Sequence, residues 1–424
     1  MSVFAKATAS PSRSKRTLLS GLAIMGASAL VLAGCATDGG ETPSGPAGDL
    51  SLKLGTALPV TGNLAFLGPP EIAGTEYAAA QINEADAGIQ IELIQGDSGD
   101  TDNKAYETEI PRLLNEGVSA ILGAASSGVS LQFIDQVVGA GVIQFSPANT
   151  SAAFTDYDDK GLYFRTAPSD VLQGEVLGNL IAADGHETLG MVVLNDSYGT
   201  GLAKFTQEAF EAAGGEVVSQ PTYNTGDTTF DAQISEVLAS DPDAIALITF
   251  EEVSTMLPSI VSNFPAENLY FVDGNLANFG DEFAAGTLAG AKGTLPGLSV
   301  DTIADFTSAV NDFWVESGQP ELEEFSYAAE SFDSVVLLAL ASLAAGSTDS
   351  AAIAEKLQEV SGGSGDGEKC TTFADCAEII NGGGVADYDG ISGPISFNDL
   401  GDPTEAKVGI YQYGDDNTYS AYNG

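Results

Sequence analysis

The side chains that could build a catalytic centre are few and scattered. The only histidine, His186, stands in the hydrophilic run Asp184-Gly185-His186-Glu187, which indicates a surface loop rather than a general base beside a nucleophile. The chain has no Gly-x-x-x-x-Gly-Lys phosphate loop, and no Gly-x-Gly-x-x-Gly opens a helix after the first apolar stretch. The carboxylates of Glu251 and Glu252 are adjacent in the chain, so their spacing does not place them on one substrate. We therefore expect no enzyme activity, no cofactor and no metal site.

Cys370 and Cys376 form a close pair near the C-terminal end of the chain. In an exported protein, a pair with this spacing predicts a disulfide that closes a small loop. Metal ligation is the weaker alternative, because His186 is the only imidazole and lies far away in the sequence.

Cys35 ends an N-terminal segment that has the zones of an export signal. Residues 18–32 are apolar and rich in small residues, too short for a membrane span but suited to a signal core. The preceding zone is basic, with Lys6, Arg13, Lys15 and Arg16. Leu32-Ala33-Gly34-Cys35 resembles a bacterial lipobox, which implies that residues 1–34 are removed and that the Cys35 thiol carries a lipid anchor. The alternative is an ordinary secretory signal followed by a chance cysteine.

Residues 35–49 and the overall charge indicate how the folded part of the chain is attached and what its surface repels. The run from 36 to 49, ATDGGETPSGPAGD, has too little apolar surface to fold and predicts a flexible tether. Four of the 14 basic residues precede Cys35, so the mature chain keeps 10 against 60 acids, a formal charge of about −50. Such a body repels nucleic acid and anionic headgroups. We interpret the acids as a solubilising surface, with a functional acidic patch as the alternative.

After the tether, short apolar runs alternate with amphipathic stretches, which favours parallel sheets covered by helices. The pattern predicts strands in the first part at 52–58, 89–95, 119–122 and 142–145, with helices at 72–83, 104–115 and 131–138. It restarts near Thr188, with strands at 189–194, 216–219, 244–248 and 269–272 and helices at 202–213, 230–239 and 255–263. The last part predicts helices at 303–317, 327–345 and 353–360, and strands at 394–397 and 408–413.

These elements predict an α/β protein with two lobes, each with its own parallel sheet. The segment 162–174, with Arg165, Pro168 and Gly174, is the expected crossing between them. We expect lobe 1 to comprise 50–167 and 297–388, and lobe 2 to comprise 168–296 and 389–424.

Two runs of small and hydroxyl side chains follow successive expected strands of the first lobe. Residues 124–128 are Ala-Ala-Ser-Ser-Gly, and residues 146–150 are Ser-Pro-Ala-Asn-Thr. Ligands of open α/β sheets bind beyond the carboxyl ends of strands, where helix N-termini supply N–H donors. These runs therefore indicate a site for a carboxylate, with ordinary helix capping as the alternative for each run.

Five segments resemble the branched-chain amino acid binding-protein family, the type I periplasmic binding proteins of ABC importers. They are residues 54–83, 123–130, 146–155, 195–202 (NDSYGTGL) and 271–278 (FVDGNLAN). The resemblance implies two Rossmann-like lobes joined by a three-crossover hinge, closing on a small solute. It implies as partners an amino acid and an ABC permease with its ATPase, and we expect a monomer on the outer face of the membrane.

The resemblance implies eight ligand-binding positions: Ser126, Ser127, Ala148, Thr150, Tyr198, Phe250, Asp273 and Tyr327. Ser127, with Ser126 before it, would bind the α-carboxylate, and the Ala148 carbonyl and Thr150 would hold the α-ammonium and the carboxylate. Asp273 would balance the ammonium, while the three aromatic residues would form the side-chain wall.

This sequence departs from the family at Leu67 and Phe250, where tyrosines are usual, and Asp273 aligns only after a shift of one residue. These departures leave the side chain of the ligand open, and relatives also bind amides, urea-like solutes and aromatic acids. A sensing receptor subunit of the same fold is the alternative role, and a secreted hydrolase is disfavoured by the missing catalytic groups.

Overall fold

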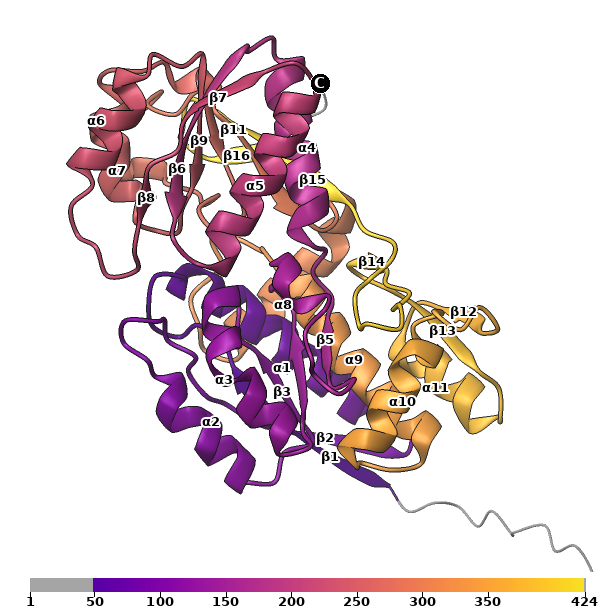
Figure 1. Cartoon of the computed structure of the whole chain (residues 1–424). Coiled ribbons are helices and arrows are strands. Elements are labelled where there is room, and N and C mark those ends of the chain that lie inside the picture. The colour runs from indigo at the N-terminus through magenta and orange to yellow at the C-terminus, as the bar shows by residue number, and fades with distance from the viewer. Residues whose placement is uncertain (1–48, 423–424) are drawn as a thin grey trace, which may run out of the picture. The chain divides into compact units, whose positions relative to one another are not determined.

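The computed structural model describes residues 49–422 and contains two large sheets (Figure 1). Residues 1–34, Cys35 and the tether up to residue 48 lie outside the described residues, so those predictions stay predictions. The five-stranded sheet and its helices are called the first lobe here, and the eight-stranded sheet and its helices are called the second lobe.

The first sheet is entirely parallel, in the order β2-β1-β3-β4-β5. Its strands are β1 (Leu50–Ala57), β2 (Ile89–Ile94), β3 (Ala120–Gly123), β4 (Ile143–Ser146) and β5 (Tyr163–Arg165). In β3, Ile121 packs with helices α2 (Tyr106–Asn115) and α3 (Ser127–Gly139), whereas Ala120 and Leu122 belong to the core on the opposite face. Helices therefore cover both faces, as the continuous apolar strands predict.

The opposite face of the first sheet is covered by the N-terminal helix and by the helices of the last part of the chain. They are α1 (Gly68–Ala85), α8 (Ala304–Glu316), α9 (Ala328–Ala345), α10 (Ser350–Val360) and α11 (Phe373–Asn381). Among the described residues, α9 is apolar and long enough to cross a membrane, but 83% of it is buried inside the protein. It is the central helix of this core.

The second sheet is mixed, with the order β16-β15-β11-β10-β9-β6-β7 and β8 also paired with β6. Its parallel strands are β6 (Thr188–Leu194), β7 (Glu216–Ser219), β8 (Thr222–Tyr223), β9 (Ala244–Ile248), β10 (Leu269–Phe271) and β11 (Lys292–Pro296). The antiparallel strands β15 (Val408–Tyr413) and β16 (Tyr419–Ala421) complete one edge. The helices of this lobe are α4 (Asp170–Ala183), α5 (Ser197–Ala212), α6 (Asp231–Ala239) and α7 (Val253–Val261).

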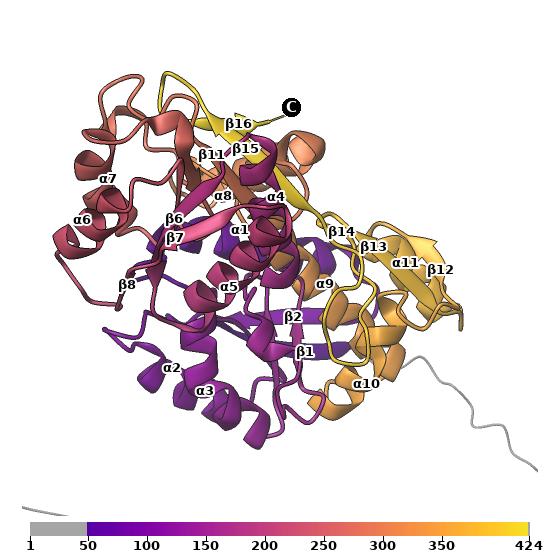
Figure 2. The same cartoon turned by 45° about the horizontal axis from the view of Figure 1, so that its top comes forward.

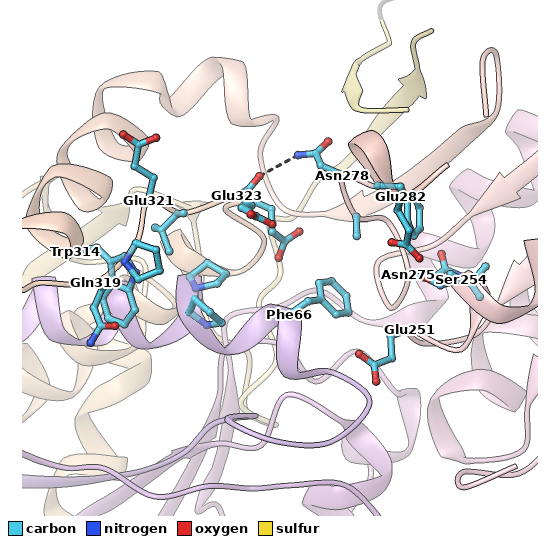
Figure 3. Close-up of a pocket in the computed structure, with 18 residues that line it drawn as sticks. Phe66, Glu251, Ser254, Asn275, Asn278, Glu282, Trp314, Gln319, Glu321 and Glu323 are labelled. Carbon is cyan, nitrogen blue, oxygen red and sulfur yellow. Dashed lines mark hydrogen bonds between the residues drawn. The ribbon is translucent and has the colours of Figure 1, made fainter. Parts of the chain in front are cut away.

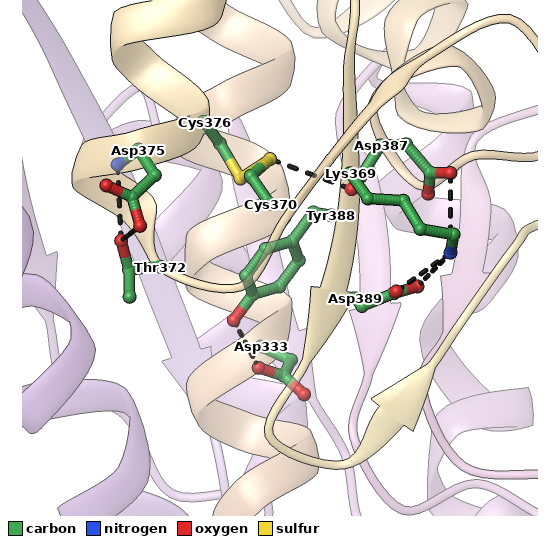
Figure 4. Close-up of a disulfide and its surroundings, with 9 residues drawn as sticks. All are labelled: Asp333, Lys369, Cys370, Thr372, Asp375, Cys376, Asp387, Tyr388 and Asp389. Atoms are coloured by element: carbon green, nitrogen blue, oxygen red, sulfur yellow. Dashed lines mark hydrogen bonds and ion pairs between the residues drawn. A yellow bond between two sulfur atoms is a disulfide. The ribbon is translucent and has the colours of Figure 1, made fainter.

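Short 3-10 turns occur at Ala65–Leu67, Ala152–Phe154, Ala266–Asn268, Gly280–Glu282 and Val300–Ile303. A small third sheet contains β12 (Glu368–Cys370), β13 (Ala386–Gly390) and β14 (Gly393–Pro394). Cys370 and Cys376 are joined by a disulfide, as their spacing predicts, and this bond ties β12 to α11 (Figure 4). Asp333 of α9 accepts hydrogen bonds from the Tyr388 hydroxyl and from Ser392, which fastens the small sheet to the first lobe.

The chain crosses between the two large sheets three times, and the crossings lie together. They follow β5, β11 and β14, and residues from all three line one small cavity beside Glu330. Figure 2 shows the last of them, where the yellow C-terminal segment leads from β14 to β15. The first and third crossings are joined by a buried ion pair between Arg165 Nε and Asp402 Oδ1, 2.6 Å apart. The architecture is therefore the two-lobed, three-crossover α/β fold expected from the sequence.

Several elements differ from the sequence expectations. The segment 162–174, expected as a crossing, also contains the first turn of α4, which begins at Asp170 after the Ser169 cap. The strand expected at 394–397 is only β14, Gly393–Pro394. The strands β5, β8, β11, β12, β13 and β16 and the helices α4 and α11 were not expected from the sequence. In β11 a lysine, a glycine and a proline mask a strand whose five residues are all buried. The residue limits of the lobes stay a prediction.

Candidate functional site: a cavity between the two lobes

The predicted ligand-binding residues come together at one place. Strands β3 and β4 of the first sheet and β6, β9 and β10 of the second all point their carboxyl ends toward the interlobe region. The segments that follow these strands surround a small cavity that the side chains nearly fill, which we call the inner cavity. All eight predicted residues line it, together with Leu64, Leu67, Ala125 and Gly274.

The first lobe contributes hydroxyl groups that are held by backbone contacts. Ser126 caps α3 and its side chain accepts a hydrogen bond from the Val129 amide, so capping and a place in the cavity are compatible. The Ser127 hydroxyl accepts a hydrogen bond from the Ser151 amide at 3.2 Å. Because Ser127 is the first residue of α3, the unpaired amides of that helix end lie nearby and favour a negatively charged group.

Asp273 is the most heavily hydrogen-bonded side chain of the inner cavity. Its Oδ1 accepts from the Tyr198 hydroxyl at 2.7 Å and from Gln173 Nε2 at 2.8 Å, and its Oδ2 accepts from the Tyr327 hydroxyl at 2.7 Å. Burial raises the pKa of this carboxyl, while the three hydrogen bonds oppose that shift. The carboxylate that we expected to face an ammonium is thus already held by protein donors from both lobes.

Aromatic side chains form one wall of the inner cavity. The rings of Tyr198 and Phe250 stack with centroids 5.3 Å apart. Phe250 has no hydroxyl, and Leu67 stands where the family resemblance implies a tyrosine, so this wall is apolar. An apolar wall suits an alkyl or aryl side chain.

Two residues of α4 were missed by the sequence reasoning. Gln173 donates to Asp273, and Asp170 is fully buried beside Thr150, whose carbonyl accepts from the Asp170 amide at 2.7 Å. Neither carboxyl oxygen of Asp170 has a well-formed hydrogen bond. Burial and the nearby Asp273 charge raise the pKa of Asp170, and the Thr150 hydroxyl only partly offsets them. Asp170 and Gln173 are three residues apart in an otherwise apolar helix, which places both polar side chains on one helix face and could have indicated a shared site.

A second, larger space opens next to the inner cavity. It measures about 1220 Å³ including its open mouth, and we call it the outer chamber. Figure 3 shows Phe66 and Glu251 on one side, and Glu321, Glu323, Asn278 and Glu282 on the other. The Asn278 side chain donates to the Glu323 carbonyl at 3.0 Å, so the α8–α9 loop and the second lobe meet here.

The lobes are in direct contact around these spaces. Asn63 Nδ2 donates to Glu252 Oε1 at 2.9 Å, and the Ser151 hydroxyl donates to the Ser197 carbonyl at 3.0 Å. Together with the Tyr327–Asp273 bond, these contacts hold the lobes closed over the inner cavity. Among the residues that the structure describes, no cluster of three or more His, Cys, Asp or Glu side chains could hold a metal ion.

A two-lobed α/β fold with a cavity between the lobes is the architecture of a solute-binding protein. The chain matches the family described as periplasmic binding protein over residues 51–375. This match covers well over half of the chain, and the protein belongs to that family. It is a family of extracytoplasmic binding proteins rather than enzymes.

Individual relatives agree with this assignment. The chain is 32% identical over 191 residues to a leucine-, isoleucine-, valine-, threonine- and alanine-binding protein of Pseudomonas aeruginosa, an alignment covering 44% of this chain and 50% of that relative. A leucine-binding protein of Thermotoga maritima superposes with a TM-score of 0.71 at 20% identity, covering 88% of this chain and 97% of that one. A branched-chain amino acid binding protein of Streptococcus pneumoniae in complex with isoleucine gives 0.67 at 21%, covering 88% and 99%. These two structures share the fold.

Proposed function

We propose that the protein is the solute receptor of an ABC importer and that it binds a small α-amino acid in the inner cavity. The observation that carries the proposal is the convergence of eight residues from separate segments of both lobes on that cavity. The names of the similar proteins, which include leucine- and isoleucine-binding proteins, support the same class of solute.

In this proposal the head of the amino acid lies between the two lobes. Its carboxylate accepts hydrogen bonds from Ser127, Thr150 and the backbone amides at the start of α3. Its ammonium lies at Asp273. Three hydrogen-bond donors stabilise the negative charge of this side chain, but a buried carboxylate still needs a counter-charge. The stacked Tyr198 and Phe250, with Tyr327, receive the side chain.

We also propose that the mature protein begins at an acylated Cys35 and remains at the outer face of the membrane. The basic zone, apolar core and Leu-Ala-Gly-Cys sequence support this proposal. A Cys35→Ala variant is expected to leave the membrane fraction while it keeps solute binding. A variant that stays with the membrane, compared by fractionation with the wild type, would contradict the anchor.

The binding proposal is tested by thermal shift of the full chain in detergent. Because a ligand of the native state raises the melting temperature, the panel contains aliphatic amino acids, amides, urea and aromatic acids. We expect shifts with α-amino acids and none with urea. A shift only with amides or aromatic acids would reject the zwitterionic head, and would leave the receptor class with a different cargo.

A further inference from the structure

The charged side chains that line the outer chamber are all acidic. Its lining contains five carboxylates and no lysine, arginine or histidine, and the carboxylates are Glu251, Glu282, Glu321, Glu323 and Glu324. None of the ion pairs among residues 49–422 involves these five side chains. Four of them are exposed on the rim, so by themselves they resemble the rest of this acidic surface.

Glu324 differs from the rim, because it is 93% buried. Its Oε2 accepts a hydrogen bond from the Ser326 hydroxyl at 3.1 Å, whereas its Oε1 is buried without any hydrogen-bond partner. The residue as a whole belongs to the lining of the chamber. A buried carboxyl oxygen without a donor is costly in a folded protein. Burial accordingly raises the pKa of Glu324 to about 8. A cation beside this oxygen would remove the cost and favour the ionised form.

The rest of the lining indicates what kind of cation fits. Phe66, Phe279 and Trp314 border the chamber, and aromatic faces attract alkylammonium and guanidinium groups. Prolines 69 and 70 and Leu322 add apolar surface, which suits the carbon chain that carries such a group. A small metal ion would instead require several converging oxygen ligands, and no such cluster exists among the described residues.

The residues that line the outer chamber and those that line the inner cavity are neighbours in the chain at several points. Leu67, Phe250 and Gly274 line the inner cavity, and their direct neighbours Phe66, Glu251 and Asn275 line the outer chamber. Neighbouring Cα atoms are about 3.8 Å apart, so the two linings adjoin at these three points. The five bonds from Cα to Nζ of a lysine span roughly 6 Å, which is longer than the spacing between these adjoining lining residues.

We propose that the outer chamber binds the cationic end of the solute whose amino acid head lies in the inner cavity, with Glu324 as the buried counter-charge. This inference rests on the proposed function and narrows the cargo to α-amino acids with a second, terminal cation. The apolar, largely aromatic wall of the inner cavity then holds the methylene chain between the two charged ends.

Two probes of equal length test this inference on the full chain in detergent by calorimetry. L-lysine carries a terminal ammonium where L-2-aminoheptanoic acid carries a methyl group. We expect wild type to bind lysine at least tenfold more tightly. Glu324→Gln, which keeps the Ser326 contact and resembles the protonated acid, should weaken lysine at least tenfold and aminoheptanoic acid less than twofold. Glu316→Gln removes the same charge from the exposed end of α8, outside the chamber, and should change neither.

The outcomes separate the two proposals. Equal or tighter binding of aminoheptanoic acid by wild type, or an equal loss of both probes in Glu324→Gln, overturns the cation site and leaves the amino acid receptor standing. Retained binding of aminoheptanoic acid shows that Glu324→Gln is folded. If wild type binds neither probe, nor leucine, the proposed function fails, and the cation site fails with it.

Discussion

The inner cavity and the outer chamber both contain a buried carboxyl group, but the protein treats the two groups differently. Asp273 is held by Tyr198, Tyr327 and Gln173. Glu324 has one hydroxyl partner, and its second oxygen has none. A carboxylate with several hydrogen-bond donors is a fixed part of the architecture. A buried carboxylate with an unpaired oxygen destabilises the folded protein, and a ligand that pairs with this oxygen removes that cost. The comparison predicts that the first group governs folding and closure, and that the second governs selectivity.

The largest effect is expected for Asp273→Asn. The amide NH2 replaces one of the two carboxylate oxygens and meets at least one group that already donates. We therefore expect a loss of about 3 kcal/mol in the free energy of unfolding and at least tenfold weaker binding of an amino acid, about 1.4 kcal/mol. Urea unfolding and calorimetry measure the two effects. Asp156→Asn, at an exposed position of the first lobe, is the matched control. Unchanged affinity would remove Asp273 from the site.

A smaller effect, of opposite sign, is expected at Glu324. Burial raises its pKa from 4.5 to about 8, so between these values the folded state holds a proton that the unfolded state has released. Stability from this group is therefore present at low pH and is lost as the pH rises toward 8. We expect Glu324→Gln to gain about 2 kcal/mol over wild type between about pH 6 and about pH 8.5.

Urea unfolding of wild type, Glu324→Gln and Glu316→Gln at both pH values measures this difference. Glu316→Gln should follow wild type, because Glu316 is exposed. The buried Glu330, whose pKa is also raised by burial, remains in all three proteins. The pKa of Glu71 is raised by burial and by the charge of Glu324, so part of the difference between wild type and Glu324→Gln is carried by Glu71. If the free energy of unfolding changes with pH in the same way for Glu324→Gln and wild type, the pKa of Glu324 is not raised in the folded protein.

Tyr327→Phe should have an intermediate effect that is confined to closure. The hydroxyl joins Asp273 of the second lobe to the start of α9 in the first lobe. Its loss removes one hydrogen bond to a charged acceptor, so we expect roughly fivefold weaker amino acid binding. Tyr198→Phe removes a bond within the second lobe and should lower stability more than affinity. Equal losses of affinity in both variants would mean that the Tyr327 bond has no special role in closing the lobes.

The smallest effect is expected at the rim of the outer chamber. Glu282 is exposed, and exposed charges contribute little because water and salt screen them. Glu282→Gln should change lysine affinity less than twofold, against at least tenfold for Glu324→Gln. Similar losses in the two variants would show that the chamber acts through its summed charge and not through one buried group.

The residues around the inner cavity were predictable because they follow apolar strands, and strand ends can be recognised from local sequence. The runs 124–128 and 146–150 fall directly after β3 and β4. Strand β11 could not be recognised, because Lys292, Gly293 and Pro296 disfavour a strand in isolation and only the neighbours β10 and β15 stabilise it.

Asp170 and Gln173 were missed for a related reason, because α4 begins inside a segment that was expected to be a crossing. Glu324 could not have been distinguished from the other glutamates by sequence. Its neighbours Glu321 and Glu323 are exposed, and only tertiary packing buries the third acid of that short run. Burial of a charged group is a property of the assembled fold and leaves no local pattern.

The direction of β1 has a practical consequence. Leu50 begins this strand and Ala57 ends it beside Gly123, at the edge that leads to the inner cavity. With a rise of about 3.3 Å per residue, the first residue of the strand stands roughly 23 Å from that edge. A bead or an electrode coupled to the chain before residue 50 would therefore be attached at the end of the sheet that is remote from the inner cavity. Such an immobilised receptor is expected to keep its mouth free for solute, which suits it to use as a sensor.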